Sequence, residues 1–390
     1  MAGPDPKLLA RLTQNAVHVL PEGELERKLA LGRPLRVKLG IDVTAPDIHI
    51  GHAIPLQRMR AFQDEGHVGV LIVGDYTTRI GDPSGRSSER PILSDEDIDR
   101  NAKTYLDQAS QVIDTGPDRL EVRFNGEWLS ELDFAEVVRL TRTITVARLL
   151  ERDDFAKRFA KQSPISVSEL LYPFMQAYDS VAVRADVELG GTDQLYNLLA
   201  GREVQQAYGQ EPQVALTTPL LLGSDGRKMS ASFGNYVGLR EAPEGQFGKA
   251  MRISDDMLPE YYAFVMERDP PDGDPLEAKL ALARFVVERS HGADAATLAE
   301  AHFTRVVREG QAPDEVPEIR VAGDGGMVHV PAVLVEHLGV GSTSEARRMI
   351  AQGGVKIDGE PLADVDVPAG RLDGALLQAG KRRFARVVVG

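Results

Sequence analysis

The sequence of 390 residues contains no cysteine. This absence excludes disulfide bonds, thiolate nucleophiles and thiolate metal ligands. The sequence also lacks any run of about 18 or more apolar residues, so we expect no membrane-spanning helix and no membrane partner. Its first residues lack a charged segment followed by an apolar one, which argues against a secretory signal. We therefore expect a globular protein of the cytoplasm.

An excess of positive charge is lacking as well, because the formal charge is -14 at pH 7. Such a charge argues against a protein whose whole surface binds nucleic acid. The segment 341–390 differs, since it holds eight Lys or Arg against six Asp or Glu, a net charge of +2. The chain length favours roughly two or three domains, and we expect the C-terminal one to be electrostatically distinct.

Strand-like and helix-like stretches alternate along the first half of the chain. Apolar strands are predicted at residues 35–41 and 68–73, and amphipathic helices follow them at about 51–65 and 96–113. The alternation resumes with a strand at 184–189. This pattern predicts an α/β fold, a Rossmann-like doubly wound parallel sheet with helices on both faces.

Composition suggests further boundaries. The stretch from about 120 to 170 is helix-rich and holds the only tryptophan, Trp128, so we interpret it as an insertion between two halves of the sheet. A later segment rich in Pro, Asp, Glu and Gly has linker composition. The predicted units are a catalytic domain (1–240), an α-helical domain (241–315), a linker (316–329) and a small α+β domain (330–390).

The first candidate site is the segment His-Ile-Gly-His at residues 49–52, between the first predicted strand and helix. Open parallel sheets bind ligands at this edge, and a helix N-terminus attracts phosphate through its free amides. His49 and His52 add hydrogen-bond donors, and Gly51 lets a flat ring approach the backbone. A nucleotide phosphate would suit this site. Ordinary surface or core histidines are the alternative, and zinc would need a third ligand that is not nearby.

The second candidate site is the basic loop Gly-Arg-Lys-Met-Ser at residues 226–230, after an apolar strand predicted at 220–222. A mobile basic loop can clamp phosphates, whereas the alternative is an ordinary solvated turn. Taken with the histidine segment, the loop resembles the two signature motifs of class I aminoacyl-tRNA synthetases. That resemblance implies that Lys228 binds the pyrophosphate part of ATP.

The third candidate site is one face of a predicted helix. Spacings of four and three residues place Tyr172, Gln176 and Asp179 on that face, among apolar neighbours. A buried Gln and Asp need polar partners, which either a polar ligand or a structural pair could supply. The helix resembles the tyrosine-binding helix of bacterial tyrosyl-tRNA synthetases, which implies contacts with the amino group and the phenolic hydroxyl of tyrosine. A buried Asp179 facing that hydroxyl should reject phenylalanine, which leaves the carboxylate unpaired.

The same resemblance implies roles for the remaining site residues. The implied catalytic residues are Thr44, His49, His52, Lys228 and Arg86. The implied ATP contacts are Gly40, Asp42, His49, Gly51, His52, Gly191, Asp193, Lys228, Met229 and Ser230. The implied tyrosine contacts, besides the three helix residues, are Thr77, Asp82 and Gln194.

Two positions depart from the family pattern. The second lysine of the signature loop is Ala231, so one phosphate-binding cation is missing, and Arg86, Arg90 or a monovalent cation is the hypothetical replacement. Lys38 stands where some members have a tyrosine that touches the substrate hydroxyl. Recognition of that hydroxyl would then rest mainly on Asp179.

The C-terminal segment 344–359 resembles a small RNA-binding domain shared by a ribosomal protein, some pseudouridine synthases and bacterial tyrosyl-tRNA synthetases. The resemblance implies tRNA contacts for Arg347, Arg348 and Lys356. From charge alone, a solvated amphipathic helix remains open, since +2 is too small a charge to indicate RNA binding.

The complete resemblance implies a tyrosine–tRNA ligase that uses tyrosine, ATP and tRNA(Tyr). It also implies a homodimer formed through the insertion. Magnesium would arrive with ATP, because no dedicated carboxylate site is visible. One alternative is a tryptophan enzyme of the same class, which Asp179 and the C-terminal domain disfavour. The other is a non-catalytic RNA-binding protein, and Ala231 is the only feature that supports it.

Overall fold

The structure, a computed structural model, describes residues 5–44, 47–83, 93–230, 233–309, 316–322, 326–380 and 383–390. The chain divides into two compact units. The first comprises Met1–Ala242 with Lys249–Ser290, and the second comprises Pro243–Gly248 with His291–Gly390. Among the described residues, no helix is long and apolar enough to cross a membrane.

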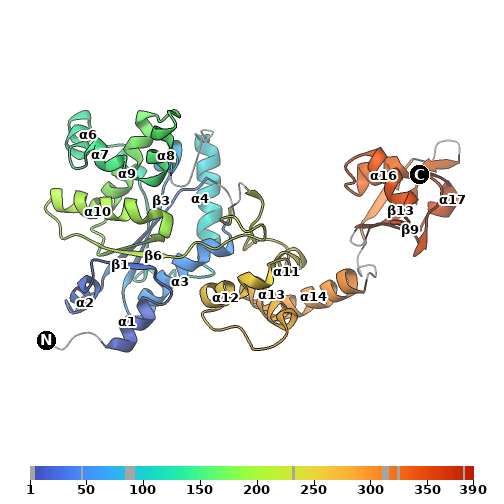
Figure 1. Ribbon diagram of the computed structural model, residues 1–390, viewed down its shortest axis with the longest axis horizontal. Coiled ribbons are helices and arrows are strands. Elements are labelled where there is room, and N and C mark those ends of the chain that lie inside the picture. Colours follow the sequence, from blue (N-terminus) through green and yellow to red (C-terminus); the bar gives the residue numbers. More distant parts are fainter. Residues whose placement is uncertain are drawn as a thin grey trace. The chain divides into compact units, whose positions relative to one another are not determined.

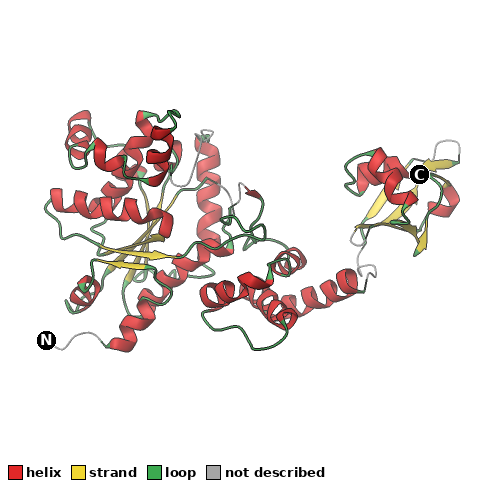
Figure 2. Ribbon diagram, in the orientation of Figure 1, coloured by secondary structure: helices red, strands yellow, loops and turns green. Residues whose placement is uncertain are grey.

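A six-stranded sheet forms the centre of the first unit (Figures 1 and 2). Its strand order is β1-β6-β5-β2-β3-β4, and all neighbouring strands are parallel except β1 and β6. The strands are β1 His18–Leu20, β2 Arg36–Ile41, β3 Val68–Val73, β4 Leu120–Phe124, β5 Val187–Gly191 and β6 Val214–Thr218. The Rossmann-like class predicted from the sequence is confirmed, with an antiparallel edge strand added.

A continuous apolar run explains the central strand β3. Five of the six residues of β3 are buried, as expected for a strand covered on both faces.

The first unit also contains the following helices: α1 Pro6–Leu12, α2 Glu24–Leu29, α3 Ile50–Asp64, α4 Asp95–Ala109, α5 Gly126–Leu129, α9 Val167–Ala182 and α10 Leu195–Ala207.

Two segments differ from the sequence-based expectation. Residues 120–124, expected at the start of the insertion, form β4 and pair in parallel with β3. The apolar residues 220–222 are not a regular strand, because the strand before the signature loop is β6, which already ends at Thr218. Apolar character alone does not distinguish a strand from the buried segment that follows it.

Short helices between β4 and α9 make up most of the expected insertion: α6 Phe134–Thr141, α7 Val146–Leu149 and α8 Asp153–Ala160. In Figure 1 they lie near α9. Leu140, Leu149 and Phe174 belong to one buried cluster that joins α6, α7, α9 and α10. A capping box starts α9, where the Ser166 hydroxyl accepts from the Glu169 amide at 3.3 Å and the Glu169 carboxylate accepts from the Ser166 amide at 2.9 Å. The buried cluster of α6, α7, α9 and α10, together with the capping box, holds α9 in place.

The helices after the signature loop are α11 Pro243–Ala250, α12 Leu258–Tyr261, α13 Pro275–His291 and α14 Ala293–Phe303. This agrees with the helical pattern expected from about residue 241 onward. Phe247 and Phe303 pack with ring centroids 5.4 Å apart.

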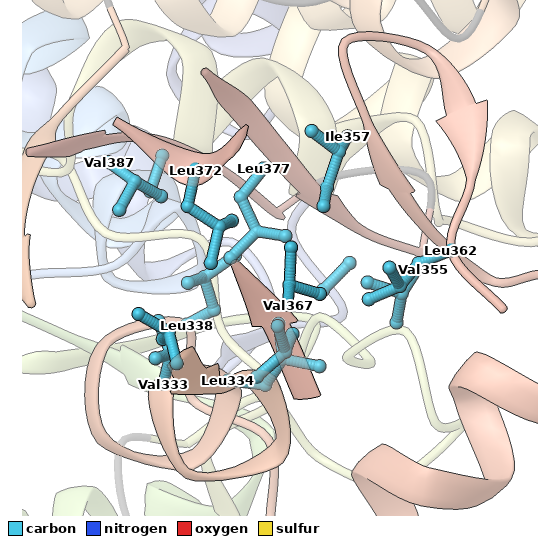
Figure 3. Packing of buried hydrophobic residues seen from close by; sticks show 14 of the residues in the cluster. Val333, Leu334, Leu338, Val355, Ile357, Leu362, Val367, Leu372, Leu377 and Val387 are labelled. Carbon is cyan, nitrogen blue, oxygen red and sulfur yellow. The ribbon is translucent and has the colours of Figure 1, made fainter. Parts of the chain in front are cut away.

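The C-terminal module has its own core (Figure 3). Side chains such as Leu334, Val355 and Leu377 come from different elements and point toward one centre in Figure 3. Its elements are β7 Glu318–Val321, β8 Met327–His329, α15 Val330–His337, α16 Thr343–Ala351, β9 Val355–Ile357, β10 Glu360–Pro361, β11 Asp366–Pro368, α17 Ala369–Leu372, β12 Leu376–Ala379 and β13 Arg383–Val389.

The described parts of the expected linker, 316–329, contain strands. β7 pairs in parallel with β13, and β8 pairs antiparallel with β11. Both partners lie far along the chain, so the local Pro and Gly content gave no indication of this pairing. The C-terminal sheet therefore begins no later than Glu318.

Candidate active site

An open cavity of about 250 Å³ lies where the parallel strands of the first unit end. The loops after β2, β3, β5 and β6 supply wall residues, which is the usual ligand-binding edge of such a sheet. The site residues predicted from the sequence that line it are Gly40, Asp42, Thr44, His49, Gly51, His52, Thr77, Asp82, Tyr172, Gln176, Asp179, Gly191, Asp193, Gln194, Lys228 and Met229. The fold therefore brings three separate motifs into one chamber.

A few predicted residues are not among the described residues of the cavity wall. Ser230 is not in the cavity wall; its amide donates to Asn235 Oδ1 at 2.9 Å. Arg86, Arg90 and Ala231 fall outside the residues that the structure describes. Arg347 and Arg348 are exposed on α16, and the predicted tRNA contact Lys356 is half-buried on β9 of the C-terminal module.

The N-terminus of α3 brings both signature histidines to the cavity. His49 precedes the helix, and its ring stacks on that of His52 with centroids 3.7 Å apart. A Cβ at Gly51 would lie 3.0 Å from His49 Nδ1, so a larger residue would press on that ring. Gly51 thus serves the packing of His49, and the access for a flat ring expected from the sequence stays a prediction.

Both imidazoles favour the neutral form. Burial lowers the pKa of His49 well below its ordinary value, and His52 and Lys228 lower it further. The surrounding protein lowers the pKa of His52 to about 4, with a smaller effect of Lys228, although the His52 side chain remains exposed to the cavity. Neutral imidazoles can each donate one hydrogen bond to a phosphate oxygen.

The signature loop is held to the cavity wall at Lys228 and at Met229. The Met229 amide donates to the Leu221 carbonyl at 2.9 Å, and Lys228 Nζ lies 2.5 Å from Asp193 Oδ2. Lys228 is about half exposed, so this ion pair is at the cavity surface. A nucleotide that binds between these groups would compete with Asp193 for the lysine.

The side chain of Asn235 holds this loop through several hydrogen bonds. Its Nδ2 donates to Asp225 Oδ1 at 2.7 Å and to the Lys228 carbonyl at 3.1 Å, and its Oδ1 accepts from the Ser230 amide. The following segment pairs with the histidine motif, because the Ile50 amide donates to the Val237 carbonyl at 3.0 Å. The two signature motifs are therefore held together by backbone contacts.

At the opposite end, Tyr172 and Thr77 converge on Asp42. The Tyr172 hydroxyl donates to Asp42 Oδ2 at 3.0 Å, and Thr77 Oγ1 donates to Asp42 Oδ1 at 2.7 Å. Burial, with Asp42 and Asp82 nearby, holds the pKa of Tyr172 well above its ordinary value, so its hydroxyl keeps its proton. A Cβ at Gly74 would overlap the Thr77 and Asp42 oxygens, which explains the glycine.

Asp179 is a buried carboxyl group between two donors. Trp128 Nε1 donates to Oδ1 at 2.8 Å, and Asn125 Nδ2 donates to Oδ2 at 3.3 Å. Burial raises its pKa to about 7, against the lowering effects of Lys38, Trp128 and Asn125. The carboxyl group therefore changes its charge close to neutral pH.

A further chain of polar contacts reaches the wall through Asp82. Gln194 Nε2 donates to Asp82 Oδ2 at 2.7 Å, and Gln194 Oε1 accepts from Asn197 Nδ2 at 3.0 Å. Asn197 in turn accepts from Arg152 at 3.0 Å. This chain fixes which end of the Gln194 amide faces Asp82.

Sequence reasoning missed several residues of the site. Asn125 lines the cavity and follows β4, in which apolar and charged residues alternate, so its place after that alternating segment was the one available signal. Trp128 was assigned to the insertion, and no local pattern links it to Asp179. Tyr105 of α4 also lines the cavity, with its ring centroid 6.2 Å from that of His52. No feature of the sequence around Asn235 indicated that it belongs to the site.

Within the described ranges, no group of three His, Asp or Glu side chains could hold a metal ion.

Comparisons with known proteins agree with this geometry. The family model described as tRNA synthetases class I (W and Y) matches residues 30–308, and the model of the S4 domain matches residues 331–369. The tyrosine–tRNA ligase of Geobacter sulfurreducens is 48% identical over 396 residues, which cover 97% of this chain and 98% of the relative. That of Moorella thermoacetica is 47% identical over 393 residues, which cover 96% of this chain and 94% of the relative.

Among solved structures, the tyrosyl-tRNA synthetase of Archaeoglobus fulgidus complexed with L-tyrosine is similar in fold. The TM-score is 0.59 at 22% identity, and the match covers 75% of this chain and 99% of the other. Since the family model spans most of the chain and full-length relatives approach half identity, this protein belongs to the class I tRNA synthetases of the tryptophan and tyrosine family, with an S4 domain at its C-terminal end.

Proposed function

We propose that the chain is a tyrosine–tRNA ligase, which activates tyrosine with ATP and transfers the tyrosyl group to the 3′ end of tRNA(Tyr). The observation that carries this function is the similarity to tyrosine–tRNA ligases over nearly the whole chain. The cavity accounts for it chemically, because a buried carboxyl group and two phosphate-binding motifs face one chamber.

We assign the tyrosine site to the end of the cavity around Asp179. The phenolic hydroxyl would donate to the Asp179 carboxylate, which Trp128 and Asn125 already orient. Phenylalanine would leave that buried carboxylate without a donor, which costs free energy. The amino group would lie among acceptors of Asp82, Tyr172, Gln176 and Gln194, with Thr77 behind them.

We assign the ATP site to the end formed by α3 and the signature loop. Gly40, Asp42, Gly51, Gly191 and Asp193 would accommodate the nucleoside, and Met229 and Ser230 would shape the loop. The tyrosine carboxylate, already ionised near neutral pH, would attack the α-phosphate and release pyrophosphate. No protein nucleophile is needed, so rate acceleration would come from positioning and from donors that meet negative charge on phosphate: Thr44, His49, His52 and Lys228.

Magnesium would enter as the ion bound to the ATP phosphates, as is common for this metal. Because Ala231 replaces the second lysine of the signature loop, Arg86, Arg90 or a monovalent cation is the proposed source of the missing charge. Activation kinetics of Ala231→Lys provide the check: an unchanged rate would mean that position 231 does not face phosphate.

We propose a homodimer formed through the insertion at about 120–170. Exposed apolar side chains gather on its elements, including Phe134 at 83%, Phe159 at 65% and Val167 at 75% exposure. Several exposed apolar residues on neighbouring helices favour a protein interface over an isolated surface. We also place the activity in the cytoplasm, where translation uses charged tRNA.

The remaining division of labour follows the predicted domains. Residues 1–240 would catalyse both steps, 241–315 would contact the anticodon region, and 330–390 would hold the tRNA through Arg347, Arg348 and Lys356. Residues between these units, 316–329, would connect them where they are not part of the C-terminal sheet.

Amino-acid-dependent exchange of pyrophosphate into ATP tests the function. Tyrosine should support exchange, and tryptophan and phenylalanine should not. Exchange with tryptophan would favour the other member of the family. Absence of exchange with every amino acid would favour a non-catalytic RNA-binding protein.

A further inference from the structure

A fully buried ion pair lies beside the proposed tyrosine site. Lys38 Nζ is 2.9 Å from Glu188 Oε1, and both residues have no exposed surface. Lys38 is absent from the cavity wall, so it does not contact a ligand there directly. An ion pair this deep is costly to desolvate and is weak evidence for stability.

Strand register explains how the pair forms. Lys38 of β2 and Glu188 of β5 are direct partners in the parallel ladder, so their side chains emerge on the same face of the sheet. Helix α9 covers this face, because Lys38 Nζ also donates to Ser180 Oγ at 2.7 Å and to the Gln176 carbonyl at 2.9 Å. The pair thus joins the sheet to the helix that carries the proposed tyrosine contacts.

Glu188 touches the side chain of Gln176 directly. Gln176 Nε2 donates to Glu188 Oε1 at 3.1 Å. An ionised carboxylate only accepts hydrogen bonds, so it selects the NH₂ end of the amide and rejects its oxygen. The opposite end, Gln176 Oε1, is buried and has no hydrogen-bond partner among the described residues. Gln176 also lines the cavity, so a ligand there can supply the missing donor.

Resting on the tyrosine site proposed above, we propose that the Lys38–Glu188 pair positions Gln176. Glu188 holds the amide in the one orientation that keeps Oε1 free to accept from the ammonium group of tyrosine. Lys38 holds the Glu188 carboxylate in place beside Gln176. Neither residue touches the substrate, so both are positioning residues for recognition of the amino group.

The double substitution Lys38→Met with Glu188→Gln tests the inference without leaving a buried charge unpaired. Gln213 Nε2 and Ser180 Oγ both donate to Glu188 Oε2. A glutamine at 188 should therefore keep its oxygen at that position and turn its NH₂ toward Gln176. Gln176 would then reverse and present its own NH₂ to the substrate ammonium.

The readout is a ratio of two affinities, that of tyrosine over that of 3-(4-hydroxyphenyl)propionate, which lacks the amino group. The single tryptophan, Trp128, lies at the site and reports binding of either ligand by fluorescence. Loss of one hydrogen bond to a charged group predicts that the double variant lowers this ratio by about tenfold or more. Affinity for the analogue and KM for ATP should stay within about twofold of wild type.

Gln213→Met is the matched control. It removes a donor to Glu188 Oε2 and leaves the Oε1 contacts to Lys38 and Gln176 in place, so the ratio should not change. Gln176→Met keeps the ion pair and removes the amide, so it should lower the ratio as the double variant does, even if the latter folds poorly.

A wild-type ratio in a folded double variant, or in Gln176→Met, would overturn the positioning role. A wild-type protein that gives no tyrosine-dependent exchange would instead overturn the proposed function itself. The two failures are thus distinguishable.

Discussion

The polar groups of the cavity differ most in their states of protonation. His49 and His52 are held neutral by burial and by nearby positive charge, whereas Asp179 can change its charge near neutral pH. Each state follows from the surroundings of the group and not from its type. These states lead to predictions for single residues.

His52→Ala should slow tyrosine activation, because it removes a preorganised donor to phosphate. The expected cost is about 3 kcal/mol in the activation barrier, seen in the rate and not in tyrosine affinity. Pre-steady-state formation of the adenylate measures the rate, and equilibrium tyrosine binding is the control. A wild-type activation rate would refute the role of His52.

Tyrosine affinity should weaken as the pH falls below about 7. Burial raises the pKa of Asp179 to about 7, and only the charged form accepts freely from the phenolic hydroxyl. Binding should therefore release a proton at slightly acidic pH, which calorimetry in buffers of different ionisation enthalpy detects. Asp179→Asn should abolish this proton release; its persistence in the variant would assign it to another group.

The raised pKa of Asp179 also makes the free energy of unfolding depend on pH, in a direction that can be predicted. Between its ordinary pKa of 3.8 and about 7, the folded protein holds a proton on Asp179 that the unfolded chain has lost. The folded state binds more protons in this window, so the contribution of Asp179 to the free energy of unfolding decreases as the pH rises through it. Asp179→Asn should flatten that part of the pH profile.

Among the elements, the signature loop is held by hydrogen bonds from a single side chain, that of Asn235. Asn235 ties Asp225, Lys228 and Ser230 together, and it comes from the segment that also pairs with the histidine motif. Because Asn235 does not bind the Lys228 side chain, a loop held by Asn235 still allows Lys228 to leave Asp193 and pair with a phosphate.

Asn235→Ala should loosen this loop and impair ATP use. Loss of two or three hydrogen bonds suggests about 2 kcal/mol of lost transition-state stabilisation, or roughly 30-fold in kcat/KM for ATP. Tyrosine binding should remain normal. Arg227→Gln, which alters an exposed residue of the same loop, is the control. Unchanged ATP kinetics in Asn235→Ala would mean that the loop is ordered by other contacts.

At the scale of the whole molecule, the two compact units carry different surfaces. Exposed apolar residues gather on α6 to α9 of the first unit, and exposed arginines lie on α16 of the second. We propose a second copy of the chain as the partner of the first surface and a tRNA as the partner of the second.

Phe134→Glu combined with Phe159→Glu should shift the protein from dimer to monomer, because each change buries a charge in the proposed interface. Analytical ultracentrifugation measures the mass. Leu298→Glu is the matched control, since Leu298 is 68% exposed on α14, outside the insertion. A wild-type protein that is already monomeric would contradict the proposed interface.

Arg347→Ala combined with Arg348→Ala should weaken tRNA binding and leave tyrosine activation unchanged. If both arginines contact phosphates, the slope of log affinity against log salt should fall by roughly one per arginine. Arg371→Ala, an exposed arginine on α17, is the control. An unchanged slope would show that other residues hold the tRNA.

Much of the fold and the site could be predicted from the sequence, because local periodicity determines strands and helices. The apolar run at 68–73 is β3, and the spacing of Tyr172, Gln176 and Asp179 does place all three in one cavity wall. The signature motifs are equally local, so the residue order was enough to propose His49, His52 and Lys228 as site residues, and the structure places all three in one cavity wall. The strands β4, β7 and β8 could not be predicted, since pairing partners distant in the chain stabilise them.

By itself, the sequence determined which chemical groups are available and which short segments carry them. Only the tertiary structure decided what surrounds each group. Trp128 and Asn125 reach Asp179 across about fifty positions of chain, and Lys38 meets Glu188 because β2 and β5 are neighbours in one register. The order of strands in the sheet sets these contacts, and that order minimises the free energy of the whole domain, so no single segment encodes it.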